Sequence, residues 1–268
     1  SSCNYSIEPL LHPPLAGEDF KKNDMKNIVI ILALILSANF LLAQPAGFWG
    51  PRPETVQVWP DGAPNAFAYD EAADPQGDKY KDAILEIYPA RNPNGYCVLL
   101  CPGGGYAVLS MGHEGRDMKE WFNARGFTFA LLQYRMPRGH HDVPLSDVQQ
   151  SMRILHSRED LGIKNVGVMG FSAGGHLAST AATHYVDEVT RPDFQILFYP
   201  VISMDEKMTH KGSCVNFLGD GRKDEKLVKQ FSNMNAVRRH QTPPAIIFTA
   251  GDDRAVHCTD LASDGCAH

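Results

Sequence analysis

The sequence lacks the features of most nonglobular and nucleic-acid-binding proteins. Its 25 lysines and arginines are outnumbered by 31 aspartates and glutamates, the net charge is −6, and no basic patch stands out. We therefore expect no nucleic-acid partner. The chain has no repeats or low-complexity blocks, and its 43% hydrophobic and 21% charged residues are ordinary globular values. Disordered, collagen-like and coiled-coil classes are excluded.

The six cysteines have neither zinc-site spacing nor the arrangement of a disulfide framework. Cys97 and Cys101 lie four residues apart on one expected strand. Their Cα atoms would be roughly 13 Å apart, too far for a disulfide. Cys214 is isolated, and the remaining cysteines lie in terminal segments: Cys3, Cys258 and Cys266. We expect no metal site and no cofactor.

The chain also lacks a membrane span near its N-terminus, since the apolar run from Ile28 to Leu36 is too short to cross a bilayer. This run follows a short positive start at Met25, and a small residue precedes Gln44. The pattern predicts a secretory signal peptide over residues 25–43 and a periplasmic or secreted mature protein. No cysteine follows the cleavage position, so we expect no stable membrane anchor. A buried N-terminal helix is the less favoured alternative.

The chain divides into three parts around this signal. Residues 1–24 precede the signal peptide, which is unusual, and we interpret them as a translated upstream segment that is not part of the mature protein. Residues 44–268 have the length of one large domain with a sizeable core.

Apolar runs alternate with helix-like stretches along this domain. The expected strands are 56–60, 84–89, 96–101, 127–134, 166–171, 194–200 and 245–251. The expected helices are 113–125, 145–158, 174–185 and 224–237. Several strands are continuous apolar runs, as is typical of strands buried on both faces. The alternation predicts an α/β fold with a mostly parallel sheet and helices on both faces.

The strongest chemical motif is Gly170-Phe171-Ser172-Ala173-Gly174. An apolar strand precedes it and a helix-like stretch follows, which is the strand–turn–helix setting of a nucleophile elbow. So tight a turn needs small residues two positions before and after the serine, as Gly170 and Gly174 provide. Ser172 would project its hydroxyl at a helix N-terminus, whose dipole favours developing negative charge. A glycine-rich turn without chemistry is the alternative.

A glycine run, Gly103-Gly104-Gly105, follows the strand 96–101. Such a run lets backbone N–H groups point at a ligand oxygen. A phosphate loop would continue with lysine and a hydroxyl residue, whereas Ala107 and Val108 follow here. The position, before the serine elbow, favours an oxyanion-hole loop over a flexible loop or a phosphate cradle.

These motifs resemble the α/β-hydrolase fold, and more narrowly the exported carbohydrate esterases described as acetylxylan or feruloyl esterase-like. The resemblance covers most of the mature chain and is carried by residues 102–115, 131–137, 143–155, 170–180 and 194–204. It implies that Ser172 is the nucleophile, that the N–H groups of Gly104, Gly105 and Ala173 are oxyanion donors, and that no metal is needed. Lipase-type relatives carry histidine where this chain has Pro102.

The resemblance places the catalytic acid just after the seventh strand, where Asp252 and Asp253 are candidates. The family pattern puts the acid three residues before a valine, and Val256 makes Asp253 the favoured residue. Its role would be to orient and stabilise a catalytic imidazolium. An aspartate at this position commonly stabilises only the turn, but serine followed by aspartate is the chain order of the fold.

The catalytic histidine is not evident. The fold needs it beyond one further helix and strand, about 25–40 residues after the acid, yet only 15 residues follow Asp253. His257 is too close to Asp253, and neither it nor His268 has the Gly-flanked setting of the family. We therefore expect the last strand and helix to be missing, through truncation or a shifted reading frame near residue 257, which makes the tail 257–268 suspect. We also expect this chain to have little activity.

Other polar residues have structural interpretations that we favour. His113-Glu114 would open the next helix rather than line the pocket, and His140-His141-Asp142 would be a solvated loop rather than a metal cluster. His176 would be a packed histidine rather than the base, and Arg135 would pair with a carboxylate near the sheet edge.

The sequence as a whole predicts a serine esterase that acts on a small-molecule or polysaccharide ester, with acetyl or feruloyl groups on plant polysaccharide implied by the resemblance. A serine peptidase of the prolyl-oligopeptidase type shares the fold and the elbow, but usually carries a large extra domain. A truncated hydrolase-fold protein that at most binds ligand is the other alternative.

Overall fold

The computed structural model describes residues 53–67, 77–253 and 255–256. The predicted signal peptide and the segment before it lie outside the described residues, as do His257 and His268. In the part of the chain that is described, no helix is both long and apolar enough to cross a membrane.

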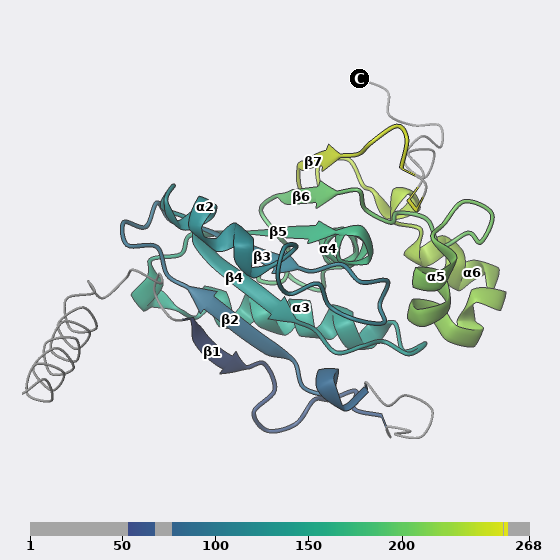
Figure 1. Cartoon of the computed structure of the whole chain (residues 1–268), viewed down its shortest axis with the longest axis horizontal. Coiled ribbons are helices and arrows are strands. Elements are labelled where there is room, and N and C mark those ends of the chain that lie inside the picture. The colour runs from purple at the N-terminus through teal and green to yellow at the C-terminus, as the bar shows by residue number, and fades with distance from the viewer. Residues whose placement is uncertain (1–52, 68–76, 254, 257–268) are drawn as a thin grey trace, which may run out of the picture. The chain divides into compact units, whose positions relative to one another are not determined.

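The described strands form one seven-stranded sheet in the order β1-β2-β4-β3-β5-β6-β7 (Figure 1). The strands are β1 (Glu54–Gln57), β2 (Ile84–Tyr88), β3 (Tyr96–Cys101), β4 (Thr128–Gln133), β5 (Asn165–Phe171), β6 (Gln195–Phe198) and β7 (Ala245–Phe248). The sheet is parallel from β4 to β7, whereas β2 runs antiparallel to both β1 and β4. Every predicted strand is present, and the mostly parallel sheet is confirmed.

The described helices follow the strands in the predicted alternation. They are α2 (Lys119–Asn123), α3 (Asp142–His156), α4 (Ser172–Thr183), α5 (Lys211–Leu218) and α6 (Glu225–Phe231). Short 3₁₀ turns lie between them: η1 (Gly77–Tyr80), η2 (Arg116–Met118), η3 (Glu159–Leu161), η4 (Gly219–Lys223) and η5 (Asn233–Ala236).

The helices differ from the prediction in three places. In the predicted helix 224–237, only Glu225–Phe231 is α-helical, and η5 follows after Ser232. The predicted helix 113–125 is shorter, because residues 113–115 remain in the loop and only η2 and α2 are helical. Helix α5 was not predicted at all. Its N-cap is His210, whose ring accepts from the Ser213 N–H, and histidine is not among the usual capping residues that mark a helix start.

Successive side chains of β3 point to opposite faces of the sheet, and each face has its own apolar cluster. Leu99 packs in one apolar cluster with Met152 of α3. Val98 and Leu100 point to the other face and pack in a second cluster with Phe122 of α2. Figure 1 shows α3 running behind the sheet. Helices therefore cover both faces, as a buried parallel sheet requires. Cys97 and Cys101, on this strand, are free thiols, as predicted.

Strand β7 departs from the expectation that its apolar run is buried. It is an edge strand whose residues are all exposed. Ile246 is 58% exposed, Ile247 44% and Phe248 48%. Phe248 stacks on Phe198 of β6 with ring centroids 4.6 Å apart.

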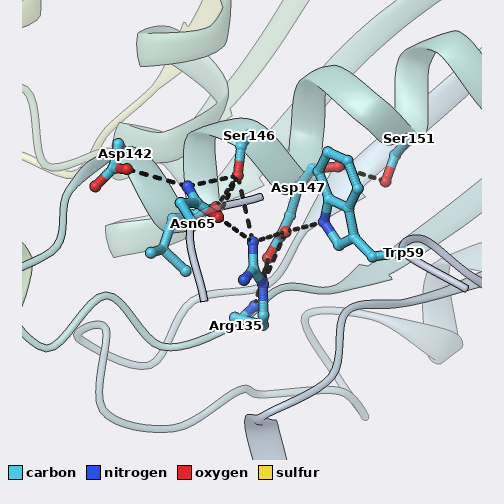
Figure 2. A network of polar contacts seen from close by, with 8 residues as sticks. Trp59, Asn65, Arg135, Asp142, Ser146, Asp147 and Ser151 are labelled. Carbon is cyan, nitrogen blue, oxygen red and sulfur yellow. Dashed lines mark hydrogen bonds and ion pairs between the residues drawn. The ribbon is translucent and has the colours of Figure 1, made fainter. Parts of the chain in front are cut away.

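The predicted pairing of Arg135 with a carboxylate is confirmed (Figure 2). Arg135 follows β4, and its guanidinium lies 2.7 Å from Oδ1 of Asp147, a residue of α3 that is fully buried. The Arg135 backbone N–H donates to Oδ2 of the same carboxylate at 2.9 Å, and the Trp59 indole donates to Oδ1 at 2.7 Å. This network joins the chain after β4 to α3.

Candidate active site

A pocket of ≈ 470 Å³ lies where several parallel strands end. Its lining residues come from the glycine loop, the serine elbow, the end of β6 and the turn after β7: Gly104, Gly105, Val108, Leu109, Ser110, Glu114, Ser172, Tyr199, Asp253, Ala255 and Val256. Carboxyl ends of parallel strands are the usual place for ligand sites in α/β sheets. Four of the five predicted site residues therefore share one pocket, and Ala173 is the neighbour of Ser172.

Ser172 has the backbone geometry of a strained strand–helix turn. It is the first residue of α4, is partly exposed, and has a φ of +51°. A Cβ on Gly170 would lie 2.1 Å from the Gly174 carbonyl oxygen, and one on Gly174 would lie 2.1 Å from the carbonyl oxygen of Cys101. Both positions therefore exclude side chains. Positive φ at a non-glycine residue is a form of strain that concentrates at functional sites.

The glycine loop presents amides with no protein acceptor. Within the described residues, the N–H groups of Gly104, Gly105 and Ala173 donate to no protein atom. Gly104 and Gly105 have φ values of +136° and +65°, which turn their amides away from ordinary strand pairing. Asn216 holds the loop by donating from Nδ2 to the Gly105 carbonyl at 2.8 Å. Two adjacent free amides beside Ser172 can stabilise an anionic oxygen.

Asp253 lines the pocket, whereas Asp252 is exposed and is not among the lining residues. The Asp253 carboxylate also stabilises its own turn, since Oδ1 accepts from the N–H groups of Ala255 at 2.8 Å and Val256 at 3.0 Å. The two interpretations of this aspartate, turn residue and pocket carboxylate, are thus compatible. Its catalytic role stays a prediction.

Glu114 is a pocket residue, which was the less favoured of two interpretations from the sequence, and Tyr199 is a pocket residue that the sequence did not indicate. The pocket is lined by Glu114, against the favoured helix-opening interpretation, while His113 is exposed. The Glu114 carboxylate accepts from the Gly103 N–H at 3.0 Å and from the Tyr199 hydroxyl at 2.7 Å. Burial, the hydrogen bond to Glu114 and the charge of Asp253 raise the pKa of Tyr199 above its ordinary value, so its hydroxyl stays protonated and donates.

His176 is a packed histidine, as favoured from the sequence. It is fully buried, with Nδ1 2.8 Å from the Tyr106 hydroxyl and Nε2 2.8 Å from the Phe231 carbonyl oxygen. Burial lowers its pKa to about 4. No histidine is among the described residues that line the pocket.

The pair His140-His141 packs against aromatic rings. His140 stacks on Phe67 with centroids 4.4 Å apart, and His141 meets Phe231 edge-on at 4.5 Å. Across the described ranges, no group of three histidine, cysteine or acidic residues is arranged to hold a metal ion.

Known proteins with similar sequences and structures are hydrolases. The acetylxylan esterase of Xylanibacter ruminicola is 50% identical over 178 residues, which are 65% of this chain and 37% of that protein. The endo-1,4-beta-xylanase B of Butyrivibrio fibrisolvens is 32% identical over 177 residues, 60% of this chain and 27% of that protein. The chain thus spans about a third of the length of these curated relatives.

An acetyl ester-xyloside bifunctional hydrolase from Caldicellulosiruptor lactoaceticus has a similar solved structure. The TM-score is 0.67 at 31% identity, and the match covers 79% of each chain. A carboxylesterase from Lactobacillus plantarum has a TM-score of 0.59 at 17% identity over 79% of this chain and 76% of that one, which supports the fold alone.

The family model of the alpha/beta hydrolase fold matches residues 98–258, a segment that includes the glycine loop, the serine elbow and the turn with Asp253. The match agrees with the sheet order, the elbow geometry and the solved structures described above. The chain therefore belongs to the α/β-hydrolase fold family.

Proposed function

We propose that the chain is the hydrolase portion of an esterase that removes acyl groups from carbohydrate. The observation that carries this proposal is the pocket in which partly exposed Ser172 lies beside free backbone amides and the Asp253 carboxylate. The names of the relatives at 50% and 31% identity, an acetylxylan esterase and an acetyl ester-xyloside hydrolase, support an acetyl ester of xylan as substrate. Feruloyl esters are the second acyl class to test.

The proposed chemistry is acyl transfer through a serine ester. Ser172 Oγ attacks the ester carbonyl, and the amides of Gly104, Gly105 and Ala173 donate to the oxyanion of the tetrahedral intermediate. A base takes the hydroxyl proton and returns it to the leaving alcohol, after which water releases the acid. Asp253 would orient that base. A Ser–His–Asp mechanism here would need a histidine from outside the described residues.

Hydrolysis of p-nitrophenyl acetate and release of acetate from acetylated xylan test this proposal. Even at the low activity expected from the sequence, the wild-type chain should hydrolyse the esters faster than Ser172→Ala, which should lose the serine-dependent rate without a change in the unfolding midpoint. Methyl ferulate compares the acyl classes, and a dipeptide anilide tests the peptidase alternative. If the anilide alone is cleaved, or if S172A is as active as the wild type, the esterase proposal is wrong.

A hydrolase-fold protein without a working base is the second candidate, because no described histidine lines the pocket. Such a chain would hydrolyse p-nitrophenyl acetate only at the low level that an oxyanion hole and binding support, about 10³-fold above water. A rate that follows a titration near pH 6.5 and far exceeds this level would exclude it.

Export is also part of the proposal. The pattern of residues 25–43 supports a secreted or periplasmic protein whose mature chain begins at Gln44. N-terminal sequencing of the exported protein from its native host tests it. A mature N-terminus at Ser1 would contradict both the signal peptide and the upstream-segment interpretation.

A further inference from the structure

Glu114 joins three segments of the pocket through one carboxylate. It lies between the glycine loop and η2 and is partly buried. Oε2 accepts from the backbone N–H of Gly103, just after β3, and Oε1 accepts from the hydroxyl of Tyr199, just after β6. Each oxygen therefore holds a donor from a different strand end, and charge-assisted hydrogen bonds of this kind are stronger than neutral ones.

Gly103 is closely approached by both this carboxylate and the serine elbow. A Cβ on Gly103 would lie 2.5 Å from Glu114 Oε2, 2.8 Å from the Phe171 carbonyl oxygen and 3.2 Å from Ser172 Cβ. The carboxylate, the elbow backbone and the nucleophile's side chain therefore all crowd the Cβ position of one glycine. Any shift of the Gly103 peptide moves the following two amides relative to Ser172.

Tyr199 gives the carboxylate a fixed anchor. Its φ is +34°, a strained value for a tyrosine, and its N–H donates to the Phe248 carbonyl at 2.6 Å. Two residues later, the Val201 N–H donates to the Ser172 carbonyl at 3.1 Å. The segment that holds Glu114 from one side thus also holds the serine elbow.

The Gly103 bond also determines which amides remain available. Glu114 takes the Gly103 N–H, whereas the next two amides have no protein acceptor among the described residues. The arrangement leaves two adjacent donors beside Ser172 while their preceding peptide is fixed.

We infer that Glu114 is a positioning residue of the oxyanion loop (residues 102–110): its carboxylate fixes Gly103 against the elbow and thereby aims the Gly104 and Gly105 amides at the oxyanion. This role rests on the proposed hydrolase function, because it acts on the transition state of that reaction. The role requires two hydrogen bonds from the side chain at position 114, one to the Gly103 N–H and one to the Tyr199 hydroxyl group. It does not require the negative charge, because a nearby negative charge disfavours formation of the oxyanion.

Two substitutions separate these requirements. Glu114→Ala removes both hydrogen bonds. Glu114→Gln keeps an oxygen for the Gly103 N–H and can donate its amide to the Tyr199 oxygen, so it retains the link without the charge. Glu120→Ala, at an exposed glutamate of α2, is the matched control for loss of a glutamate side chain.

The first readout is steady-state hydrolysis of p-nitrophenyl acetate by the full chain, with S172A as background. Because a misplaced oxyanion donor weakens the transition state and not substrate binding, E114A should lower kcat about 10- to 100-fold and leave KM within about threefold. E114Q and E120A should stay within about threefold of wild type in both constants.

The second readout is amide hydrogen exchange, which needs no turnover. E114A should speed exchange in peptides covering residues 102–110 and leave the strands β3 and β5 protected, whereas E114Q and E120A should match the wild type. Equal loop exchange in E114A and wild type would overturn the inference. So would a loss of kcat and of exchange protection in E114A that is equally large in E114Q. If wild type is no more active than S172A, the hydrolase proposal fails, and the exchange data still decide whether Glu114 holds the loop.

Discussion

Replacing the buried His176 by glutamine should remove much of the acid sensitivity of folding. The imidazole lies one helical turn after Ser172 and bridges the Tyr106 hydroxyl to the Phe231 carbonyl oxygen, each at 2.8 Å. A carbonyl can only accept, so Nε2 carries the hydrogen and Nδ1 accepts from Tyr106. A second proton would go to Nδ1 and leave the tyrosine hydroxyl hydrogen without an acceptor in the core.

The magnitude follows from the pKa. Burial lowers the pKa of His176 from an ordinary 6.5 to about 4 in the folded protein. As the pH falls below 6.5, the unfolded chain binds a proton that the folded chain does not, so the free energy of unfolding decreases until pH 4. Between pH 7 and pH 5 this single group should cost about 2 kcal/mol of stability.

Urea unfolding at pH 7, 6 and 5, followed by tryptophan fluorescence, measures this contribution. H176Q is expected to be less stable than wild type at pH 7, because one of two buried hydrogen bonds is lost. The difference should shrink by about 2 kcal/mol at pH 5, since only the wild type has the imidazole. His113→Gln, at an exposed histidine, controls for loss of one imidazole. A wild-type to H176Q difference that is equal at all three pH values would refute the reasoning.

Three further substitutions test the fold and the site. Gly174→Ala would place a Cβ 2.1 Å from the last carbonyl oxygen of β3, so urea unfolding should show a loss of about 3 kcal/mol or failure to fold. Arg135→Met should cost about 3–5 kcal/mol because it leaves Asp147 charged and buried, and the double variant R135M/D147L should recover most of that loss. If Asp253 is the acid, Asp253→Asn should lower kcat for p-nitrophenyl acetate to the level of Ser172→Ala, whereas Asp252→Asn should change it less than about threefold; the reverse result would assign the acid to Asp252.

The sheet was predictable because its strands are short apolar runs between helix-like stretches. All strands described in the structure lie within or next to the predicted ranges, since continuous apolar character is what burial on both faces requires. β7 shows the limit of this rule. The run Ala245–Phe248 has the composition of a buried strand, yet its residues are exposed. An apolar composition indicates that a strand can be buried, but it does not show whether another element covers that strand.

The candidate site was predictable where it depends on motifs at strand ends. The glycine loop follows β3, Ser172 follows β5, and Asp253 follows β7. A parallel sheet brings these ends to one edge, so motif order and topology together place them in one pocket. Glu114 follows no strand directly, and it reaches the pocket because residues 113–115 stay in the loop. A pattern that is local in sequence contains no sign of a contact with Tyr199, 85 residues away.

The oxyanion loop is held from two sides by contacts of different kinds. On one side, the Asn216 amide binds the Gly105 carbonyl and His176 binds the Tyr106 hydroxyl, both within or next to the packed core. On the other, the Glu114 carboxylate binds the Gly103 N–H at the pocket wall. Because the core contacts remain when Glu114 is shortened, the loop should be displaced and not unfolded. Shortening Glu114 should therefore lower catalytic activity while the free energy of unfolding stays nearly the same. Acid acts on the other side of the loop, because protonation of His176 breaks its hydrogen bond to Tyr106 in the core. Acid should therefore lower catalytic activity and the free energy of unfolding together.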